Sequence, residues 1–426
     1  MLDIKLIREN PEKVKQALLK RMSDIDFSEL LAWDAKRISL RQESDALKAK
    51  RSEESSQIPV LKKAGQSTDE LMARMKELSD KVTAIDAEVV QIEKQMDDFM
   101  VGLPNLPLDD VVAGDKENNE VIKTFGEKPN FSFKAKDHVE LVTSLGLIDY
   151  ERGVKLGGNG FWLYKGKGAL MEWALLNYFV EEHLKDGYEL ILPPHLLNYE
   201  CGYTAGQFPK FINDVFHIKN AEGEKGMRFL LPTAETALCN IFRDEILAEN
   251  ELPKKYFAYT PCYRKEAGSY RTEERGMIRG HQFNKIEMFQ YTRPEASEAA
   301  HQELLGKAAR LVEGLGLHHR ISKLSAGDTS YGMAKTYDVE VWIPSMNDYK
   351  ELSSVSNGTD YQARRGNMRF KRDGAKKTEF MHTLNASGLA TSRIIPAICE
   401  QFQQEDGSVI VPQVLRKWVG VERLSK

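Results

Sequence analysis

The chain has few cysteines and no long hydrophobic run. Its four cysteines are far apart and form no CxxC pair: Cys201, Cys239, Cys262 and Cys399. This spacing argues against a zinc knuckle or a disulfide framework and favours a reducing compartment. No run of about 18 apolar residues occurs, so no membrane span is expected. The N-terminal MLDIKLIRENPEKVK lacks the basic leader and apolar core of a signal peptide. We therefore expect a cytoplasmic protein.

Several familiar motifs are also missing. The sequence contains no Walker A loop, GxGxxG, HExxH or GxSxG, so P-loop, Rossmann, zincin and hydrolase-elbow sites lack support. The net charge of −4 gives no sign of a nucleic-acid partner, so a nucleic-acid-binding site would have to be a local basic patch. With 426 residues, of which 41% are hydrophobic and 29% charged, the chain has a globular composition and room for two or more domains.

Residues 27–99 have the pattern of a long helical hairpin. Gly65 is the only glycine and Pro59 the only proline of this segment, and they predict an interruption between two antiparallel helices. The first half has a thin apolar pattern, with Trp33, Leu40 and Leu47 seven residues apart. The second half alternates spacings of four and three, as a coiled-coil seam does: Leu71, Met75, Leu78, Val82, Ile85, Val89, Ile92, Met96 and Phe99.

The predicted tip of this hairpin is basic. Between residues 48 and 63, five basic side chains and two acidic ones give a net charge of +3: Lys48, Lys50, Arg51, Lys62 and Lys63 against Glu53 and Glu54. A basic tip could lie along a phosphate backbone. From these residues alone, a solvated coiled-coil surface or a dimerisation arm is the favoured alternative.

A second domain follows a linker rich in Pro, Asp and Asn at residues 103–120, so we expect a boundary near residue 108. A helix at 169–187 is apolar on nearly all sides and must be buried in the core or against a second subunit. Strands are predicted at LLPTAETAL, TYDVEVWIP, YKELSSVSN and MHTLNASG, with a helix at 294–314. This mixture favours an α+β fold with an antiparallel sheet.

The most informative stretch spans residues 256–290. Two strand-like runs flank a loop rich in Arg, Glu and Gly, which predicts an antiparallel hairpin. Period-2 geometry places Arg264 and Glu266 on one face of the first strand, and Phe283, Lys285 and Glu287 on one face of the second. Such a face suits a ligand with a phosphate, a flat base and an ammonium group. The alternative is a solvated face with surface ion pairs.

Other polar residues cluster in three later segments: Thr233 with Glu235; Glu351, Ser353, Ser354 and Asn357 with Arg364 and Arg365; and Asn385, Ser387 and Arg393. No nucleophile–base pair stands out. Phosphate chemistry without a protein nucleophile works through positioning and charge neutralisation, by arginine and Mg2+.

Seven segments together resemble the seryl-tRNA synthetase family: YRKEAG, RGMIRGHQFNKIEMFQ, KTYDVEVWIP, YKELSSVSN, YQARR, HTLNASGLA and QEDGSVIVPQVLRKW. They follow a helical arm and a PNLP linker, so the resemblance covers essentially the whole chain. It implies an N-terminal tRNA-binding domain at 1–108, with the arm at 27–99, and a class II catalytic domain at 109–426. Motif 1 would lie near 166–194, motif 2 near 256–290 and motif 3 near 382–402. The implied fold is a mostly antiparallel sheet flanked by helices and preceded by the coiled-coil arm.

The resemblance also implies the activity. Members of the family activate L-serine with ATP to seryl-adenylate and pyrophosphate, and then transfer serine to the terminal ribose of tRNA(Ser). They are homodimers with motif 1 at the interface. Many members also act on tRNA(Sec), and the sequence does not decide whether this chain does. The arm, through Lys48, Lys50, Arg51, Lys62 and Lys63, would reach the long variable arm of the tRNA and read its shape and backbone. The alternative is a catalytically impaired paralogue that binds tRNA or regulates.

For ATP, the resemblance implies a role for each residue of a distributed site. Arg264 would bridge the α-phosphate and the serine carboxylate. Glu266 would hold the adenine amino group, and Phe283 would stack on the base. Arg393 would cover its other face and reach the γ-phosphate. Lys265 completes the motif 2 part of the site.

The implied magnesium ligands are Glu351 and Ser354, hard oxygen donors in YKELSSVSN. A regular strand would point these two side chains to opposite faces, so we expect a bulge or a strand end there. Leu352 and Ser353 are counted with the ATP site. The residues implied to act in catalysis are Arg264, Glu351 and Arg393.

For serine, Glu235 and Glu287 would receive the ammonium group, with Thr233 and Ala234 beside them. Glu287 and Ser387 would recognise the hydroxyl, and a pocket built to bind that group can reject alanine strongly. Asn385 and Arg264 complete the set. Lys285 is interpreted as a structural ion-pair partner only.

The sequence departs from the family pattern at a few positions. The family usually has Gly at Ala386 and Ser392, Cys at Val355 and Arg at Gly160. The extra Cβ atoms of Ala386 and Ser392 could crowd the ATP site or require altered backbone angles there. The motif 2 loop also differs, at Arg271-Thr272-Glu273-Glu274.

Overall fold

The structure is a computed structural model that describes residues 1–219, 226–266 and 276–426. The unusual loop sequence at 271–274 therefore lies outside the described residues. The chain divides into two compact units: Leu2–Ala17 with Ser23–Pro104, and Met1 with Leu18–Met22 and Asn105–Lys426. Among the residues that the structure describes, no helix is long and apolar enough to cross a membrane.

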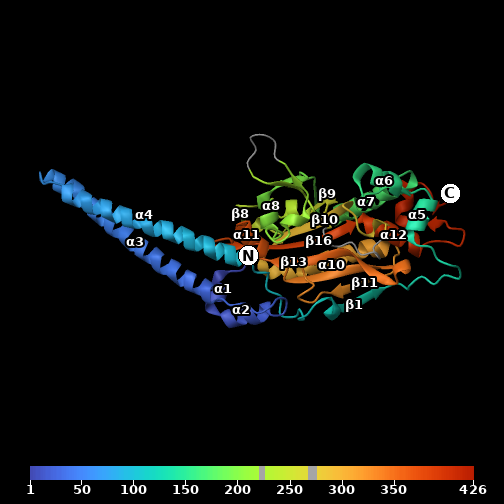
Figure 1. The fold of residues 1–426 in the computed structure, drawn as a ribbon, viewed down its shortest axis with the longest axis horizontal. Coiled ribbons are helices and arrows are strands. Elements are labelled where there is room, and N and C mark those ends of the chain that lie inside the picture. The colour runs from blue at the N-terminus through green and yellow to red at the C-terminus, as the bar shows by residue number, and fades with distance from the viewer. Residues whose placement is uncertain (220–225, 267–275) are drawn as a thin grey trace. The chain divides into compact units, whose positions relative to one another are not determined.

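The smaller unit is helical. It contains α1 (Ile4–Glu9), α2 (Pro11–Leu18), α3 (Ser28–Lys63) and α4 (Asp69–Val101). The long helices α3 and α4 lie side by side (Figure 1). The expected break at Pro59 is wrong, because α3 continues through Pro59 to Lys63. The chain reverses after α3 instead, where Gly65 adopts a φ of +69° that other residues rarely adopt.

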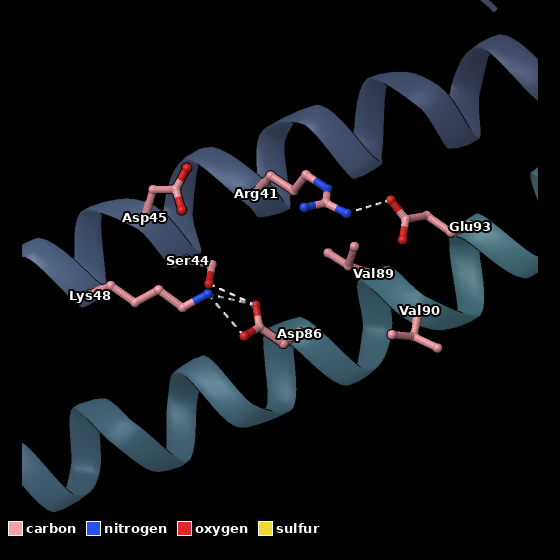
Figure 2. A pocket seen from close by; sticks show the side chains of 8 residues that line it. All are labelled: Arg41, Ser44, Asp45, Lys48, Asp86, Val89, Val90 and Glu93. Carbon is pink, nitrogen blue, oxygen red and sulfur yellow. Dashed lines mark hydrogen bonds and ion pairs between the residues drawn. The ribbon is translucent and has the colours of Figure 1, made fainter. Parts of the chain in front are cut away.

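The seam between α3 and α4 is apolar on the α4 side and partly polar on the α3 side. Ser44 is 1% exposed and its hydroxyl donates to Asp86 Oδ1 at 2.8 Å. Lys48 Nζ lies 3.0 Å from the other oxygen of Asp86, and Arg41 Nη2 lies 2.6 Å from Glu93 Oε1. These contacts surround a pocket between the helices (Figure 2). Hydrogen bonds and ion pairs thus replace apolar contacts along α3, where few apolar residues occupy the heptad positions.

The larger unit is built on an eight-stranded sheet with the order β1-β11-β12-β13-β16-β10-β9-β4. Neighbouring strands are antiparallel except β4 and β9. The α+β prediction with a mostly antiparallel sheet is confirmed. The strands are β1 (Glu120–Phe125), β4 (Glu189–Ile191), β9 (Lys254–Tyr263), β10 (Gln282–Thr292), β11 (His319–Lys323), β12 (Lys335–Ile343), β13 (Asp348–Thr359) and β16 (His382–Ala390).

Helices cover one face of this sheet. α10 (Ser297–Gly314) contacts β13 and β16, and α12 (Thr391–Gln401) contacts β10 and β12 (Figure 1). Their apolar side chains bury Ile286, Met288 and Val355 of the strands in one core. Because side chains alternate along a strand, the other face is left with polar residues, and that face carries the candidate site. The remaining helices are α5 (His138–Ser144), α6 (Tyr150–Gly157), α7 (Lys167–Lys185), α8 (Tyr199–Thr204), α9 (Glu235–Leu238), α11 (Tyr361–Arg365) and α13 (Arg416–Val419).

The predicted strand LLPTAETAL is wrong. β7 (Arg228–Leu230) ends at the first residue of this segment, and residues 235–238 form α9 instead.

The small strands are β2 (Ile148–Asp149), β3 (Leu163–Tyr164), β5 (Leu196–Asn198), β6 (His217–Ile218), β8 (Ile246–Ala248), β14 (Arg369–Lys371), β15 (Thr378–Phe380), β17 (Val409–Ile410) and β18 (Arg423–Leu424).

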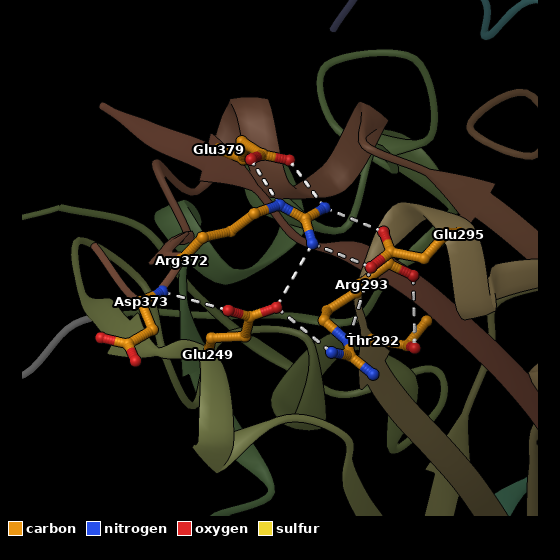
Figure 3. Close-up of polar contacts among 7 residues, drawn as sticks. All are labelled: Glu249, Thr292, Arg293, Glu295, Arg372, Asp373 and Glu379. Carbon is orange, nitrogen blue, oxygen red and sulfur yellow. Dashed lines mark hydrogen bonds and ion pairs between the residues drawn. The ribbon is translucent and has the colours of Figure 1, made fainter. Parts of the chain in front are cut away.

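An ion-pair network ties the sheet β8–β14–β15 to the end of β10. Arg372 Nε lies 2.7 Å from Glu379 Oε1, and its Nη1 lies 2.9 Å from Glu295 Oε1 and 3.3 Å from Glu249 Oε1 (Figure 3). Arg293 Nη1 contacts Glu249 as well, at 3.2 Å. The hydrogen bonds from Arg372 are the main cause that lowers the pKa of Glu295 to about 2. One guanidinium therefore joins three separate segments.

We predict that Arg372→Met lowers the Tm at pH 7, because three carboxylates lose their shared cation. A carboxyl group whose pKa is lower in the folded state than in the unfolded state stabilises the fold at pH values above the unfolded pKa of about 4.5. This stabilisation is lost as the pH falls toward the folded pKa of about 2. The difference in Tm between wild type and variant should therefore shrink over that range. Arg423→Met, which removes a single contact with Asp406 at 3.3 Å, is the control and should change the Tm less. Equal effects of the two substitutions would contradict a role of the network.

Candidate active site

The hairpin of β9 and β10 brings Arg264 and Phe283 together. Arg264 follows the last residue of β9, and its amide donates to the carbonyl of His281 at 2.9 Å. Its guanidinium carbon lies 5.2 Å from the centre of the Phe283 ring. Glu266 has a φ of +48° and its carboxylate lies 2.6 Å from Arg279 Nη1. The expectation that Arg264 and Glu266 share a strand face is thus wrong, because both lie beyond the strand.

A second cluster surrounds Glu287 on β10, which is 1% exposed. Its Oε1 accepts from Asn385 Nδ2 at 3.0 Å, and its Oε2 accepts from the hydroxyls of Thr233 and Ser387 at 3.5 Å each. Lys285 Nζ lies 2.5 Å from the same Oε2 and donates to Thr233 Oγ1 at 2.8 Å. Residues from three distant segments therefore meet at one carboxylate.

Glu235 joins this cluster from the first turn of α9. Its amide donates to Thr233 Oγ1 at 3.2 Å, and its Oε1 accepts from Gln362 Nε2 at 2.9 Å. Removal from water and the neighbouring Glu287 raise the pKa of Glu235 to about 7. A turn, not a strand, thus brings Thr233 and Glu235 together. The side chain of Ala234 packs in the core instead.

One acceptor of the cluster is left over. Asn385 Oδ1 is buried and has no hydrogen-bond partner among the described residues. A buried amide oxygen without a partner is costly, so this atom suits a donor group of a ligand.

The predicted bulge in YKELSSVSN is confirmed. Val339 pairs with Ser353 and Glu340 pairs with Glu351, so Leu352 is the extra residue of β13. The side chain of Leu352 is buried in the core, and Ser353 Oγ donates to the carbonyl of Ser387 at 2.7 Å. These two residues shape the backbone around the site rather than present side chains to it.

Arg393 lies at the start of α12, next to Glu351. Its Nη1 donates to the carbonyl oxygen of Glu351 at 2.6 Å, and its Nε donates to the carbonyl of Ile278 at 3.1 Å. On β12, Asp338 faces Ser354 across the strands, and Asp338 Oδ1 is buried without a hydrogen-bond partner among the described residues. Burial, Glu351 and Glu340 raise the pKa of Asp338. Arg393 and these oxygen groups therefore converge on the edge of the site.

This end of the site offers oxygen donors of the kind that Mg2+ prefers. Within residues 1–219, 226–266 and 276–426, no group of three His, Cys, Asp or Glu side chains could hold a metal ion.

Two departures from the family pattern have structural explanations. Ala386 pairs with Val355 and Met288 and packs with them in the core, while its neighbours Asn385 and Ser387 face the site. The expectation that the Cβ atom of Ala386 crowds the ATP site is therefore wrong. Gly160 has a φ of +81°, and a Cβ atom there would lie 2.6 Å from His281 Cδ2.

The basic residues of the arm differ in their surroundings. Lys48 pairs with Asp86, and Arg51 Nη1 donates to Ser79 Oγ at 3.2 Å. Lys50, Lys62 and Lys63 are exposed, and no ion pair joins them to any residue that the structure describes. Only part of the predicted basic tip is thus free for an external partner.

Sequence reasoning missed three residues of the site. Lys285 is interpreted from the sequence as a structural ion-pair partner, and its ion pair with Glu287 is confirmed, but its contact with Thr233 could not be predicted. Gln362 belongs to YQARR, where the two arginines draw attention instead. Asp338 lies at a position of the alternating strand that faces the site. The alternation alone does not show which polar side chain lacks a hydrogen-bond partner.

The fold and this polar face define the catalytic core of a class II aminoacyl-tRNA synthetase, and the profile of the tRNA synthetase class II core domain (G, H, P, S and T) matches residues 216–402. The profile of the seryl-tRNA synthetase N-terminal domain matches residues 1–107. The chain is 63% identical to the Serine--tRNA ligase 2 of Clostridium acetobutylicum over 100% of both chains. It is 45% identical to the Serine--tRNA ligase of Thermodesulfovibrio yellowstonii over 99% of each. The chain belongs to the seryl-tRNA synthetase family.

Solved structures agree with this assignment. The seryl-tRNA synthetase from Pyrococcus horikoshii complexed with ATP superposes with a TM-score of 0.91 at 33% identity, over 100% of this chain and 99% of that one. The cytoplasmic Serine-tRNA ligase from Naegleria fowleri in complex with AMP gives a TM-score of 0.88 at 27% identity, with the same coverage. The resemblance inferred from the sequence is confirmed.

We predict that Gly160→Ala destabilises the protein more than Gly158→Ala. Both glycines have a positive φ, +81° and +91°, so both substitutions strain the backbone. Only at Gly160 does the new Cβ meet His281, whereas nothing lies within 4 Å at Gly158. The clash should cost about 1–3 kcal/mol beyond the backbone strain, measured by urea denaturation of both variants. Equal losses of stability would show that His281 moves away freely.

Proposed function

We propose that this serine–tRNA ligase activates L-serine with ATP to seryl-adenylate and then transfers serine to tRNA(Ser). The observation that carries the proposal is the cluster of Thr233, Asn385 and Ser387 around the buried carboxylate of Glu287. The full-length similarity to proteins named Serine--tRNA ligase supports it. ATP as the co-substrate is supported by the ATP complex of the relative from Pyrococcus horikoshii.

Serine fits the polar groups of the cluster. Its ammonium group would donate to Glu235, Glu287 and the unpartnered Asn385 Oδ1. Its hydroxyl would bind between Ser387 and Glu287. Alanine lacks the hydroxyl, so Ser387 and Glu287 would each lose one hydrogen-bond partner at a buried position, which gives strong discrimination.

Adenylate formation needs no protein nucleophile. An oxygen of the serine carboxylate bonds to the α-phosphorus of ATP, the bond from that phosphorus to pyrophosphate breaks, and no proton is transferred. Arg264 would bridge the carboxylate and the α-phosphate with its planar fork, and Arg393 would bind the γ-phosphate. Positioning and charge neutralisation then supply the catalysis.

The other ATP contacts are proposed from the resemblance to the family. Adenine would stack on Phe283, where the Arg264 guanidinium lies 5.2 Å from the ring centre. Glu266 would bind the adenine amino group, with Lys265 beside it. Glu351 and Ser354 would hold Mg2+, which neutralises phosphate charge when bound.

In the second step, a hydroxyl of the terminal tRNA ribose forms an ester with the seryl carbonyl carbon, the bond from that carbon to the AMP phosphate breaks, and the hydroxyl proton passes to the departing phosphate or to water. The arm would bind tRNA(Ser) through its exposed lysines, and tRNA(Sec) is a second candidate. The binding-only paralogue is not supported, since the residues for ATP and serine are all present. We place the enzyme in the cytoplasm.

We also propose a homodimer through motif 1. Large apolar side chains of α7 and of residues 189–192 are exposed, and such a face favours an interface. The exposed fractions are 43% for Leu170, 57% for Trp173, 52% for Leu184, 37% for Leu190 and 73% for Leu192.

The direct test is pyrophosphate exchange into ATP with a panel of amino acids. We expect exchange with serine and none with alanine. Glu287→Gln should raise the KM for serine on the order of 100-fold, because a buried charged contact is lost, and should leave the KM for ATP within about twofold. Absence of exchange with every amino acid, in folded protein with Mg2+, would contradict the proposal.

The arm is tested separately. Combining Lys50→Ala, Lys62→Ala and Lys63→Ala should raise the KM for tRNA(Ser) and flatten its salt dependence, since phosphate contacts release counterions. Pyrophosphate exchange should stay unchanged. The control combines Lys76→Ala, Lys81→Ala and Lys94→Ala, which removes the same charge from α4. Identical effects of the two triple variants would assign the result to net charge rather than to the tip.

A further inference from the structure

Lys285 occupies a position that the serine site does not obviously need. It is 6% exposed, and its ammonium group contacts Glu287 Oε2 at 2.5 Å and Thr233 Oγ1 at 2.8 Å. These are two of the groups proposed to bind serine. A lysine this deep requires an ionic partner, and its partner here is the Glu287 carboxylate, around which Thr233, Asn385 and Ser387 cluster.

A count of charges explains why a second cation belongs there. Glu235 and Glu287 bring two carboxylates to a small space, and serine brings one ammonium group. Without Lys285, the carboxylates of Glu235 and Glu287 would share only the serine ammonium group. Repulsion between two neighbouring carboxylates favours protonation of one of them. With Lys285, the occupied site is neutral overall.

We propose that Lys285 is a positioning residue for serine recognition: it fixes the Glu287 carboxylate against Thr233 and balances the second carboxylate of the pocket, so that both can accept from the serine ammonium. This inference rests on the function proposed above. The geometry that carries it is the three-way contact of Lys285, Glu287 and Thr233.

The proposal has a consequence for pH dependence. The groups that face Glu235 are Glu287 and Lys285 on β10, Gln362 on α11, Arg264 beyond β9, and Cys239 directly after α9. Lys285 lowers the pKa of Glu235, which burial and Glu287 raise to about 7. Because only the ionised carboxylate binds an ammonium group well, serine binding should strengthen as the pH rises through about 7. Removal of Lys285 should move this transition to higher pH.

The experiment measures the KM of serine and of ATP in pyrophosphate exchange between pH 6 and pH 8.5 with the full-length enzyme. Lys285→Met should raise the KM for serine at pH 7 by about 10- to 100-fold, because a buried carboxylate loses its partner. The KM for ATP should change by less than about twofold, and the pH transition should shift upward. Lys285→Arg keeps the charge and should restore the wild-type transition.

Lys255→Met is the matched control. Lys255 lies on β9 and pairs with Glu303 at 2.7 Å outside the serine pocket, so its removal should leave both KM values and the pH transition unchanged. Lys285→Gln, which is neutral but polar, replaces Lys285→Met if that variant does not fold.

Three results would overturn the proposal. Parallel increases in the KM of serine and ATP, or an unshifted pH transition, would make Lys285 a general structural residue. Loss of folding in both neutral variants, with Lys285→Arg like wild type, would assign it to stability alone. Failure of the proposed function looks different, because the wild-type enzyme would then show no exchange with serine.

Discussion

The contact between the Lys285 ammonium and the Glu287 carboxylate, at 2.5 Å inside the protein, is the interaction on which the site depends. A charge buried without a partner costs several kcal/mol, so the pocket is stable only when its cations and carboxylates balance. In the proposed mode of binding, the ammonium group of serine completes that balance. Thr233 and Asn385, which bind Glu287 from distant segments, hold the carboxylate in one orientation.

The sheet delivers these side chains through local irregularities. The bulge at Leu352 turns Glu351 and Ser354 toward the same end of the site, and a second irregularity shifts the pairing of β10 with β16 between Lys285 and Glu287. Meanwhile Ala386 and Val355 keep the opposite face apolar and packed against the helices. The regular parts of the strands make the sheet rigid, and the irregularities change the direction in which the functional side chains point.

Much of this arrangement could be predicted from the sequence. The heptad spacing from Leu71 to Phe99 and the hairpin of β9 and β10 follow from side-chain periodicity. The bulge near Glu351 was expected because the family resemblance implies that Glu351 and Ser354 act together. Local pattern failed where tertiary contacts decide. Residues 235–238 read as a strand but form a helical turn, and Pro59 lies within α3. The partner of Lys285 is two residues away on its own strand, yet its role depends on Thr233 and Glu235, which only the fold brings near.

The most direct test of this account is the number of protons exchanged when serine binds, measured by titration calorimetry in buffers of different ionisation enthalpy. Because burial and Glu287 raise the pKa of Glu235 to about 7, a substantial fraction of the molecules carries a proton there at pH 7. Serine should displace it, so we predict proton release on serine binding at pH 7 and less release at pH 8. Serine binding without any proton release at pH 7 would contradict recognition by this pair of carboxylates.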